Sequence, residues 1–263
     1  MKGIRFSWPE GKAGALTTSW DDGTIHDRPL VAILNRYGLK GTWNLNSGRF
    51  GQNGAIEAAE VATLYAGHEV ACHSVTHPHL GRIPEEAVIS EIMEDRRALE
   101  HLAGYPVKGM SLPYGTYDAR VLAILRACGI VYCRPVIHRP DFGLPGDFME
   151  WAATCHHKAD LTALWEQFVK CNQPDKLFYL WGHSYEFNND KNWNHIEAFA
   201  QRAGASSDTW QATNMQIFDY VMAWRRLQSS VELTSIRNTS AVPLWFRLDG
   251  ALRTAAPGEV VTL

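Results

Sequence analysis

The sequence predicts an α/β fold in which a parallel sheet is curled into a barrel and is followed by a small β appendage. Short β-prone segments alternate with helical segments over about the first 230 residues, an order typical of parallel strands joined by helical crossovers. About seven such units fit a barrel, complete or incomplete. After residue 230 the pattern changes to short strands separated by turns, with Asp249 and Gly250 as a hairpin signal. We therefore predict a barrel at 1–230 and a β appendage packed on it at 231–263.

The first half of the chain alternates regularly after an irregular start at 1–14, where a proline and several glycines lie. The expected strands are short apolar segments, and they lie at 15–20, 40–45, 68–72, 107–112 and 130–133. The expected helices each end shortly before a glycine, and they lie at 29–37, 55–66, 84–102 and 118–128. The helix at 84–102 is the clearest, because its apolar residues, such as Val88 and Ile92, keep near-helical spacing.

The second half begins with a segment that is rich in proline, glycine and histidine, at 135–159, where we expect a long loop. The alternation then continues to the end of the barrel. Its elements are a helix at 160–172, a strand at 176–182, a helix at 193–203, a weak strand at 209–212 and a helix at 215–227.

The composition is that of a soluble globular protein and argues against several function classes. With 46% hydrophobic and 20% charged residues, the chain of 263 residues can bury a large core. The net charge of −3 argues against a basic nucleic-acid surface, so no nucleic-acid partner is expected. No apolar run approaches the ~20 residues that a membrane span needs, so no membrane partner is expected either.

The cysteines and the N-terminal residues favour a cytoplasmic protein. The five cysteines are an odd number without a tight repeated spacing, which is no disulfide framework and is typical of a reducing compartment. Residues 1–5 lack the apolar core of a secretory signal, so we expect the protein to stay inside the cell unless a leader has been trimmed.

Polar residues of the types used in catalysis follow the ends of several predicted strands. They are Asp21 and Asp22 after the first strand, His73 and His77 after the third, Pro113 and Tyr114 after the fourth, and His183 after the strand at 176–182. In parallel α/β folds the carboxyl ends of the strands meet at one edge, where active sites lie. No structural requirement explains this clustering, so we predict one functional site there.

The spacing of His73 and His77 suits a metal ion. A helical turn, or a loop coiled like one, places residues four apart on one side, where two imidazoles can take adjacent positions on an ion. Two hydrogen-bonded surface histidines are the alternative for such a pair. A carboxylate from another strand end favours the metal-site interpretation. Asp21 and Asp22 could both face this pocket, one as a metal ligand and the other as a group that exchanges a proton. Two imidazoles and one carboxylate with open positions are typical of a catalytic site.

Four short segments resemble, in order, the motifs of polysaccharide deacetylases of the NodB-homology type, which are carbohydrate esterases of family four. They read Ser-Trp-Asp-Asp-Gly at 19–23, His-Ser-Val-Thr-His-Pro at 73–78, Leu-Pro-Tyr-Gly at 112–115 and Leu-Trp-Gly-His at 180–183. The resemblance covers about 16–230 and leaves out the β appendage. It implies an irregular (β/α)7 barrel, one divalent metal that is usually zinc, and removal of an N- or O-acetyl group from an acetylated saccharide.

The resemblance also implies roles for individual residues. Asp22, His73 and His77 would hold the metal. Asp21 would be the general base that takes a proton from water activated by the metal, and His183 would be the general acid for the leaving group.

Three further residues have roles implied by the same family motifs. The backbone N–H of Tyr114 would help to form the oxyanion hole, and Pro113 of the same motif would lie at the substrate. The family has a further motif, its fourth, between the segments at 112–115 and 180–183. Residues 147–151 loosely resemble that motif, so Trp151 would line the acetyl pocket.

The chain departs from the family pattern at two supporting positions. The family has an arginine two residues before the proline of the third motif, where it orients the base, and this chain has Ser111 there. The carboxylate that tunes the family's catalytic histidine is not identifiable. We hypothesise that Glu186, or one of His156 and His157, contacts substrate or supports His183. A hydrogen-bonded loop group is the alternative for each.

Two other functions remain as alternatives to deacetylation. Barrels of this type also include hydrolases of non-sugar C–N bonds such as ring amides, sometimes without metal. A non-catalytic carbohydrate-binding relative is the second alternative, although retention of Asp21 and His183 argues against it. The β appendage either covers an end of the barrel or makes a dimer contact, so a homo-oligomer stays open.

Overall fold

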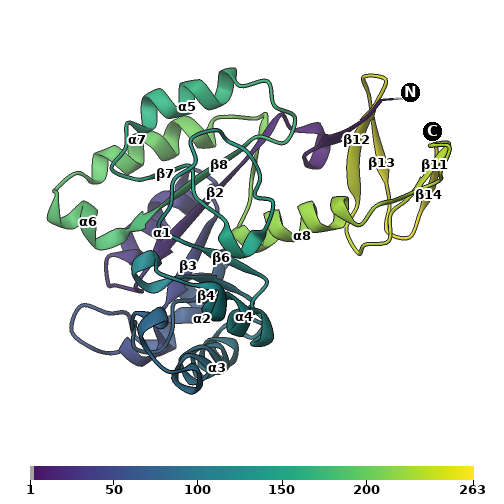
Figure 1. Cartoon of the computed structure of the whole chain (residues 1–263). Helices are drawn as coiled ribbons and strands as arrows, with labels where there is room; N and C mark the ends of the chain where they lie inside the picture. Colours follow the sequence, from purple (N-terminus) through teal and green to yellow (C-terminus); the bar gives the residue numbers. More distant parts are fainter. Residues whose placement is uncertain (1–2) are drawn as a thin grey trace.

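The computed structural model describes residues 3–263, so Met1 and Lys2 of the N-terminal segment considered above lie outside the described residues. The fold is built around a curled parallel sheet (Figure 1). Its strands are β2 (Gly14–Asp21), β3 (Gly41–Leu45), β4 (Glu69–Cys72), β5 (Gly109–Ser111), β6 (Tyr132–Arg134), β7 (Cys155–His156), β8 (Leu177–His183) and β9 (Thr209–Gln211). Seven of them follow the order β6-β5-β4-β3-β2-β8-β7, and β9 pairs with β2. This curled sheet confirms the predicted irregular (β/α)7 barrel.

Helices connect the strands of the barrel, as the alternating pattern predicts. They are α1 (Asp27–Arg36), α2 (Val61–Leu64), α3 (Glu85–Ala103), α4 (Ala119–Ala127), α5 (Leu161–Lys170), α6 (Ser184–Asn189), α7 (Trp193–Gly204) and α8 (Asn214–Arg225). Within residues 3–263, none of the helices combines the length and apolar character that crossing a membrane requires.

Strand β2 lies at the centre of the sheet and ends at the predicted site. All eight of its residues are buried, as expected for a parallel strand covered on both faces. Strand β8 pairs with it from Ala15 to Asp21 on one side. On the other side β9 pairs with Gly14–Leu16, and β3 joins from Thr18 onward. Because β2 is held along its whole length, Asp21 has a fixed position at the carboxyl edge.

The two faces of the sheet pack into different hydrophobic clusters. In β8, Phe178 and Leu180 belong to the cluster formed with the surrounding helices. The alternate residues Tyr179 and Trp181 belong to a second cluster, which includes Tyr220 of α8. Aromatic side chains therefore fill the inner face of the curled sheet.

The β appendage includes strands from both ends of the described chain. One small sheet has the order β1-β12-β13, with β1 (Ile4–Ser7), β12 (Leu244–Leu248) and β13 (Ala251–Ala255). The second has the order β10-β11-β14, with β10 (Gln228–Ser229), β11 (Ser235–Arg237) and β14 (Val260–Thr262). The expectation of an irregular segment at 1–14 is wrong for β1, because this strand gains an antiparallel partner in β12. The division of the chain at residue 230 stays a prediction.

Two further local predictions differ from the structure. The helix expected at 55–66 is limited to a short 3-10 turn and α2, because Ala55 bridges Thr24 and the N–H of Ile56 donates to Gly23. These tertiary contacts hold the start of the segment extended against the turn that follows Asp22. Helix α6, which directly follows β8, was not predicted.

Candidate active site

Side chains from five strand ends gather at the carboxyl edge of the sheet. The last residues of β2, β5, β6 and β8 are Asp21, Ser111, Arg134 and His183, and His73 directly follows β4. Ser111 and Arg134 both hydrogen-bond Asp21, and the main chain of His183 lies beside that of Asp21. The structure therefore brings together residues that lie far apart in the sequence, at the edge where parallel folds hold their sites.

Asp22, His73 and His77 present three ligand-type atoms to one another. The Oδ1 atom of Asp22 lies 3.7 Å from Nε2 of His73 and 3.7 Å from Nε2 of His77. This oxygen is buried and has no hydrogen-bond partner within residues 3–263, and the nearest guanidinium, that of Arg49, is 3.8 Å away. A buried carboxylate oxygen without a donor is unfavourable unless a cation satisfies it.

The protonation of both histidines fits a metal. His73 Nδ1 lies 2.9 Å from the carbonyl oxygen of Ser111, so this nitrogen carries the proton and Nε2 keeps a free lone pair. Burial, and then the nearby His73, lowers the pKa of His77 to about 4, so its ring is neutral near pH 7. Ligand atoms around tetrahedral zinc lie roughly 3.3 Å apart, slightly closer than these three atoms. The donor set therefore fits a divalent ion such as zinc.

The loops that carry the site have unusual backbone angles. Asp22, His77 and Tyr114 have φ angles of +83°, +62° and +58°, in the left-handed region that residues with a Cβ avoid. Each such residue costs about 1–2 kcal/mol, and residues of this kind concentrate at functional sites. The backbone is thus strained where it positions these side chains.

Asp21 is a buried carboxylate surrounded by donors. Arg134 donates to both of its oxygens, with Nη2 2.6 Å from Oδ1. Ser111 Oγ donates to Oδ1 at 3.0 Å and Asn44 Nδ2 at 2.8 Å. Burial alone would raise the pKa of Asp21, but Arg134, and then His73, hold this pKa well below its usual range. Asp21 is therefore ionised, and its Oδ2 lies 4.0 Å from Nε2 of His73.

Arg134 occupies the role of the arginine that the third motif lacks. It is the direct neighbour of Ser111 across β5 and β6, so its guanidinium reaches Asp21 from the next strand. The side chain is only 1% exposed, and its guanidinium carbon lies 4.3 Å from the centre of the Trp181 ring. Sequence reasoning missed Arg134 because one sequence does not reveal which residues are cross-strand neighbours. Its place directly after the strand expected at 130–133 was the available signal.

Glu186, one of the three residues hypothesised to contact substrate or to support His183, hydrogen-bonds the His183 ring. Helix α6 places Glu186 three residues after His183, and its Oε2 lies 2.9 Å from Nδ1 of that ring. Burial would lower the pKa of His183, but the hydrogen bond to Glu186, and then the charge of Asp21, raise it above its ordinary value. A raised pKa favours the protonated ring that a general acid needs.

His156 and His157 donate to the same carboxylate oxygen and form a second cluster of ligand-type side chains. Their Nε2 atoms lie 3.1 Å and 2.9 Å from Glu186 Oε2. Lys158 Nζ lies 3.1 Å from the other oxygen, and this ammonium would repel a metal cation. The backbone N–H of Lys158 donates to Nδ1 of His156, which leaves the proton on the Nε2 that a metal would need. The cluster therefore fits a hydrogen-bonded network around Glu186 rather than a metal.

Tyr114 lies at the exposed edge of the group formed by Asp22, His73 and His77, called the ligand group below. It occupies the short turn Pro113–Gly115 after β5, in which Pro113 is buried while Tyr114 is 55% exposed. The Tyr114 ring stacks on His79 with centroids 3.8 Å apart and meets the ring of His77 edge-on at 4.5 Å. The oxyanion role of the Tyr114 N–H and the substrate contact of Pro113 stay predictions.

Two of the predicted substrate residues are enclosed by protein. Trp151 is 1% exposed and packs against Phe148 and Tyr179 in the aromatic cluster of the inner face, so the structure does not bring it to the ligand group. His157 is fully buried. Trp181 does lie beside the site, because it contacts Arg134 and has its ring centre 5.7 Å from that of His183.

The fold and the strand-end cluster define an α/β barrel with a group of side chains at its carboxyl edge that could hold a metal ion. Residues 9–133, nearly half of the chain, match the family model described as polysaccharide deacetylase. The resemblance to NodB-type polysaccharide deacetylases that the four motifs predict is thereby confirmed.

Two curated relatives carry deacetylase names. The chain is 29% identical over 113 residues to a peptidoglycan-N-acetylglucosamine deacetylase of Bacillus cereus, and the match covers 42% of this chain and 39% of that protein. It is 32% identical over 81 residues to a chitooligosaccharide deacetylase of Bradyrhizobium sp., covering 30% of this chain and 37% of that protein. The chain thus spans about two fifths of the length of the curated relatives it matches.

Solved structures share the fold over most of the chain. A Mycobacterium smegmatis protein assigned as a polysaccharide deacetylase gives a TM-score of 0.65 at 18% identity, covering 86% of this chain and 96% of that chain. A family 4 carbohydrate esterase from Streptomyces lividans in complex with acetate gives 0.51 at 21% identity, covering 73% of this chain and 91% of that one. At these identities the likeness concerns the fold alone.

Proposed function

We propose that this protein is a metal-dependent hydrolase that removes acetyl groups from a saccharide. The observation that carries the proposal is the buried Oδ1 of Asp22, which has no hydrogen-bond partner within residues 3–263 and lies 3.7 Å from two imidazole nitrogens. Next to this group, Arg134 keeps Asp21 ionised. The family match and the names of the curated relatives support an acetylated sugar as the substrate.

Asp22, His73 and His77 would hold the divalent ion, for which zinc is our proposal. When bound, such an ion supplies a Lewis acid that acidifies a water molecule and polarises the acetyl carbonyl. Asp21 then accepts the proton of the attacking water. Because Arg134 keeps Asp21 ionised, its carboxylate is available to accept that proton.

The remaining steps use the hydrogen-bond donors of Tyr114 and His183. In the proposal, the Tyr114 N–H donates to the oxygen on which charge develops, and the strained turn at φ +58° fixes its direction. Protonated His183 donates from Nε2 to the departing amine or alkoxide, while its Nδ1–H stays on Glu186. Glu186 thus orients the ring and supports its positive charge.

The test combines metal analysis with product analysis. Wild-type protein and the variants Asp21→Asn and His77→Ala are compared for bound zinc and for acetate release from a panel of N- and O-acetylated sugars. We expect Asp21→Asn to keep the metal and lose acetate release, and His77→Ala to lose both. Asp249→Asn, in the hairpin turn of the appendage, is the matched control and should behave as wild type. Unchanged acetate release in Asp21→Asn would remove this residue from the mechanism, and hydrolysis of a cyclic amide without acetate release would favour the C–N hydrolase instead.

A further inference from the structure

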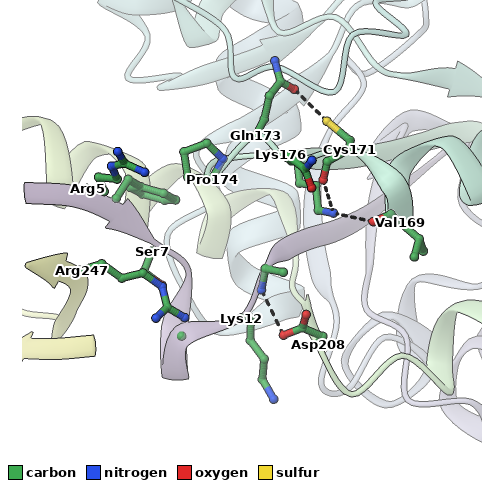
Figure 2. Close-up of a pocket in the computed structure, with 14 residues that line it drawn as sticks. Arg5, Ser7, Lys12, Val169, Cys171, Gln173, Pro174, Lys176, Asp208 and Arg247 are labelled. Atoms are coloured by element: carbon green, nitrogen blue, oxygen red, sulfur yellow. Dashed lines mark hydrogen bonds between the residues drawn. The ribbon is translucent and has the colours of Figure 1, made fainter. Parts of the chain in front are cut away.

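A second pocket lies at the opposite end of the barrel from the candidate active site. It is lined by Lys12 and Ala13 just before β2 and by Lys176 just before β8, whereas the site follows the ends of these strands. An eight-residue strand spans roughly 25 Å, so the two places are well separated. The pocket has a volume of about 440 Å³ and is bounded on its other side by strands β1 and β12 (Figure 2).

The charges around this pocket are unbalanced. Four cationic side chains line it, from Arg5, Lys12, Lys176 and Arg247, against one carboxylate, that of Asp208. The Oδ1 of Asp208 already accepts the backbone N–H of Ala13 at 3.3 Å. Lys12 also forms an ion pair with Glu10 at 3.7 Å, so the excess of positive charge comes from Arg5, Lys176 and Arg247.

The two arginines lie directly opposite one another and lack carboxylate partners. Arg5 and Arg247 form a cross-strand pair in the antiparallel ladder of β1 and β12, so both side chains lie on the same face of the small sheet. In Figure 2 the Arg247 side chain extends past Ser7 toward the pocket, while Arg5 lies on the side of Pro174. Within residues 3–263 neither guanidinium has an ion pair, and Arg247 donates only to the carbonyl of Gly250. Both arginines are exposed, and like charges directly opposite one another destabilise a sheet, so an anion bound between them would relieve a repulsion that water only partly screens.

Lys176 adds a buried positive charge to the wall of the same pocket. Its side chain is buried at 6% exposure, and its ammonium donates to the carbonyl oxygens of Phe168, Val169 and Cys171. These bonds occupy its three donors at the C-terminal end of α5, and the Phe168 ring centre lies 5.0 Å away, while no carboxylate of the described residues lies within ion-pair distance. A buried cation normally has a counter-charge, and this one lines the pocket that holds the two arginines.

We propose that this pocket binds an oxyanion, a phosphate or carboxylate group carried on a molecule of about sugar size. Guanidinium groups bind both anions through paired N–H donors. Asn172 and Gln173 in the pocket wall add amide donors, and the volume of about 440 Å³ accommodates a charged sugar unit. The proposal is independent of deacetylation, since none of the lining residues belongs to the candidate active site.

The test is calorimetric titration of the full chain with inorganic phosphate and with D-glucuronate, at an ionic strength fixed with sodium chloride. The variants are Arg5→Gln, Arg247→Gln and the pair together. Arg253→Gln is the matched control, because Arg253 pairs with Phe246 and so lies on the opposite face of the same sheet. We expect wild type and the control to bind at least one anion equally, and the double variant to bind it at least about tenfold more weakly. Binding of phosphate alone would identify a phosphate group as the ligand, and binding of glucuronate alone would identify a carboxylate. Either result supports the proposed anion site.

A second readout does not need a ligand. In buffer without multivalent anions, Arg5→Gln should melt at or above the wild-type temperature, because one of two repelling charges is removed. The proposal is overturned if wild type binds neither anion, if the double variant binds as well as the control, or if Arg5→Gln alone melts lower. If the double variant fails to fold, the two single variants decide the question by the same measurements.

Discussion

Arg134 is the most informative residue to change, because it replaces a missing motif residue from another strand. In Arg134→Gln the Asp21 carboxylate, 3% exposed, keeps only Ser111 and Asn44 as donors. Removing one partner of a buried, hydrogen-bonded ion pair costs about 3–5 kcal/mol. Because two neutral donors remain, we expect a loss of about 3 kcal/mol in the free energy of unfolding, measured by urea denaturation. With Arg134 gone, burial would raise the pKa of Asp21 against the weaker effect of His73, and a misplaced base should lower acetate release about 100-fold.

A swap of the two neighbours tests whether the position of the guanidinium matters. Ser111 and Arg134 are register partners, so Ser111→Arg combined with Arg134→Ser moves the arginine back to the third motif. Compared with Arg134→Gln, we expect this double variant to recover part of the free energy of unfolding and part of the acetate release. The control is Arg139→Gln, which removes an exposed arginine paired with Asp141 and should change neither quantity. The reasoning is refuted if Arg134→Gln unfolds at the wild-type urea concentration and keeps the wild-type acetate release.

Three further outcomes follow from other contacts. Glu186→Gln removes the anion that raises the pKa of His183, so the basic limb of the pH profile of kcat/KM should move to lower pH; an unmoved limb would contradict this role. Burial lowers the pKa of His68 to about 4 from an ordinary 6.5, so the unfolded chain binds this proton first as pH falls. Stability contributed by His68 is therefore present above pH 6.5 and lost toward pH 4, by up to about 3 kcal/mol in urea titrations, and His68→Gln should flatten that slope. Gly182→Ala would place a Cβ 2.1 Å from Cδ2 of His157, so its melting temperature should fall by several degrees; an unchanged melting curve would mean that His157 moves freely.

The parts of the fold that depend on local pattern could be predicted from the sequence. The order of strands and helices in the barrel follows from short apolar runs and the glycines that end helices, and the polar strand ends follow from the same map. Asp22 follows one predicted strand while His73 and His77 follow another, and the structure brings Nε2 of both histidines to 3.7 Å from Asp22 Oδ1. Their role as metal ligands stays a prediction until metal is measured.

The parts that depend on pairing between distant segments could not be predicted. Arg134 reaches Asp21 only because β5 and β6 align in one register, which no local pattern encodes. Strand β1 forms because of β12, near the other end of the chain. Glu186 is an intermediate case, because its spacing of three from His183 indicates contact once helix α6 is recognised.

The pairing of β1 with β12 has a consequence for how the protein is made. During synthesis Leu248, the partner of Ile4, leaves the ribosome only after all the strands of the barrel have emerged. Until then the backbone donors and acceptors of β1 face water or other chains, which is the condition under which unpaired strands associate wrongly. The barrel strands are made in between, so the barrel can assemble before β1 and β12 pair.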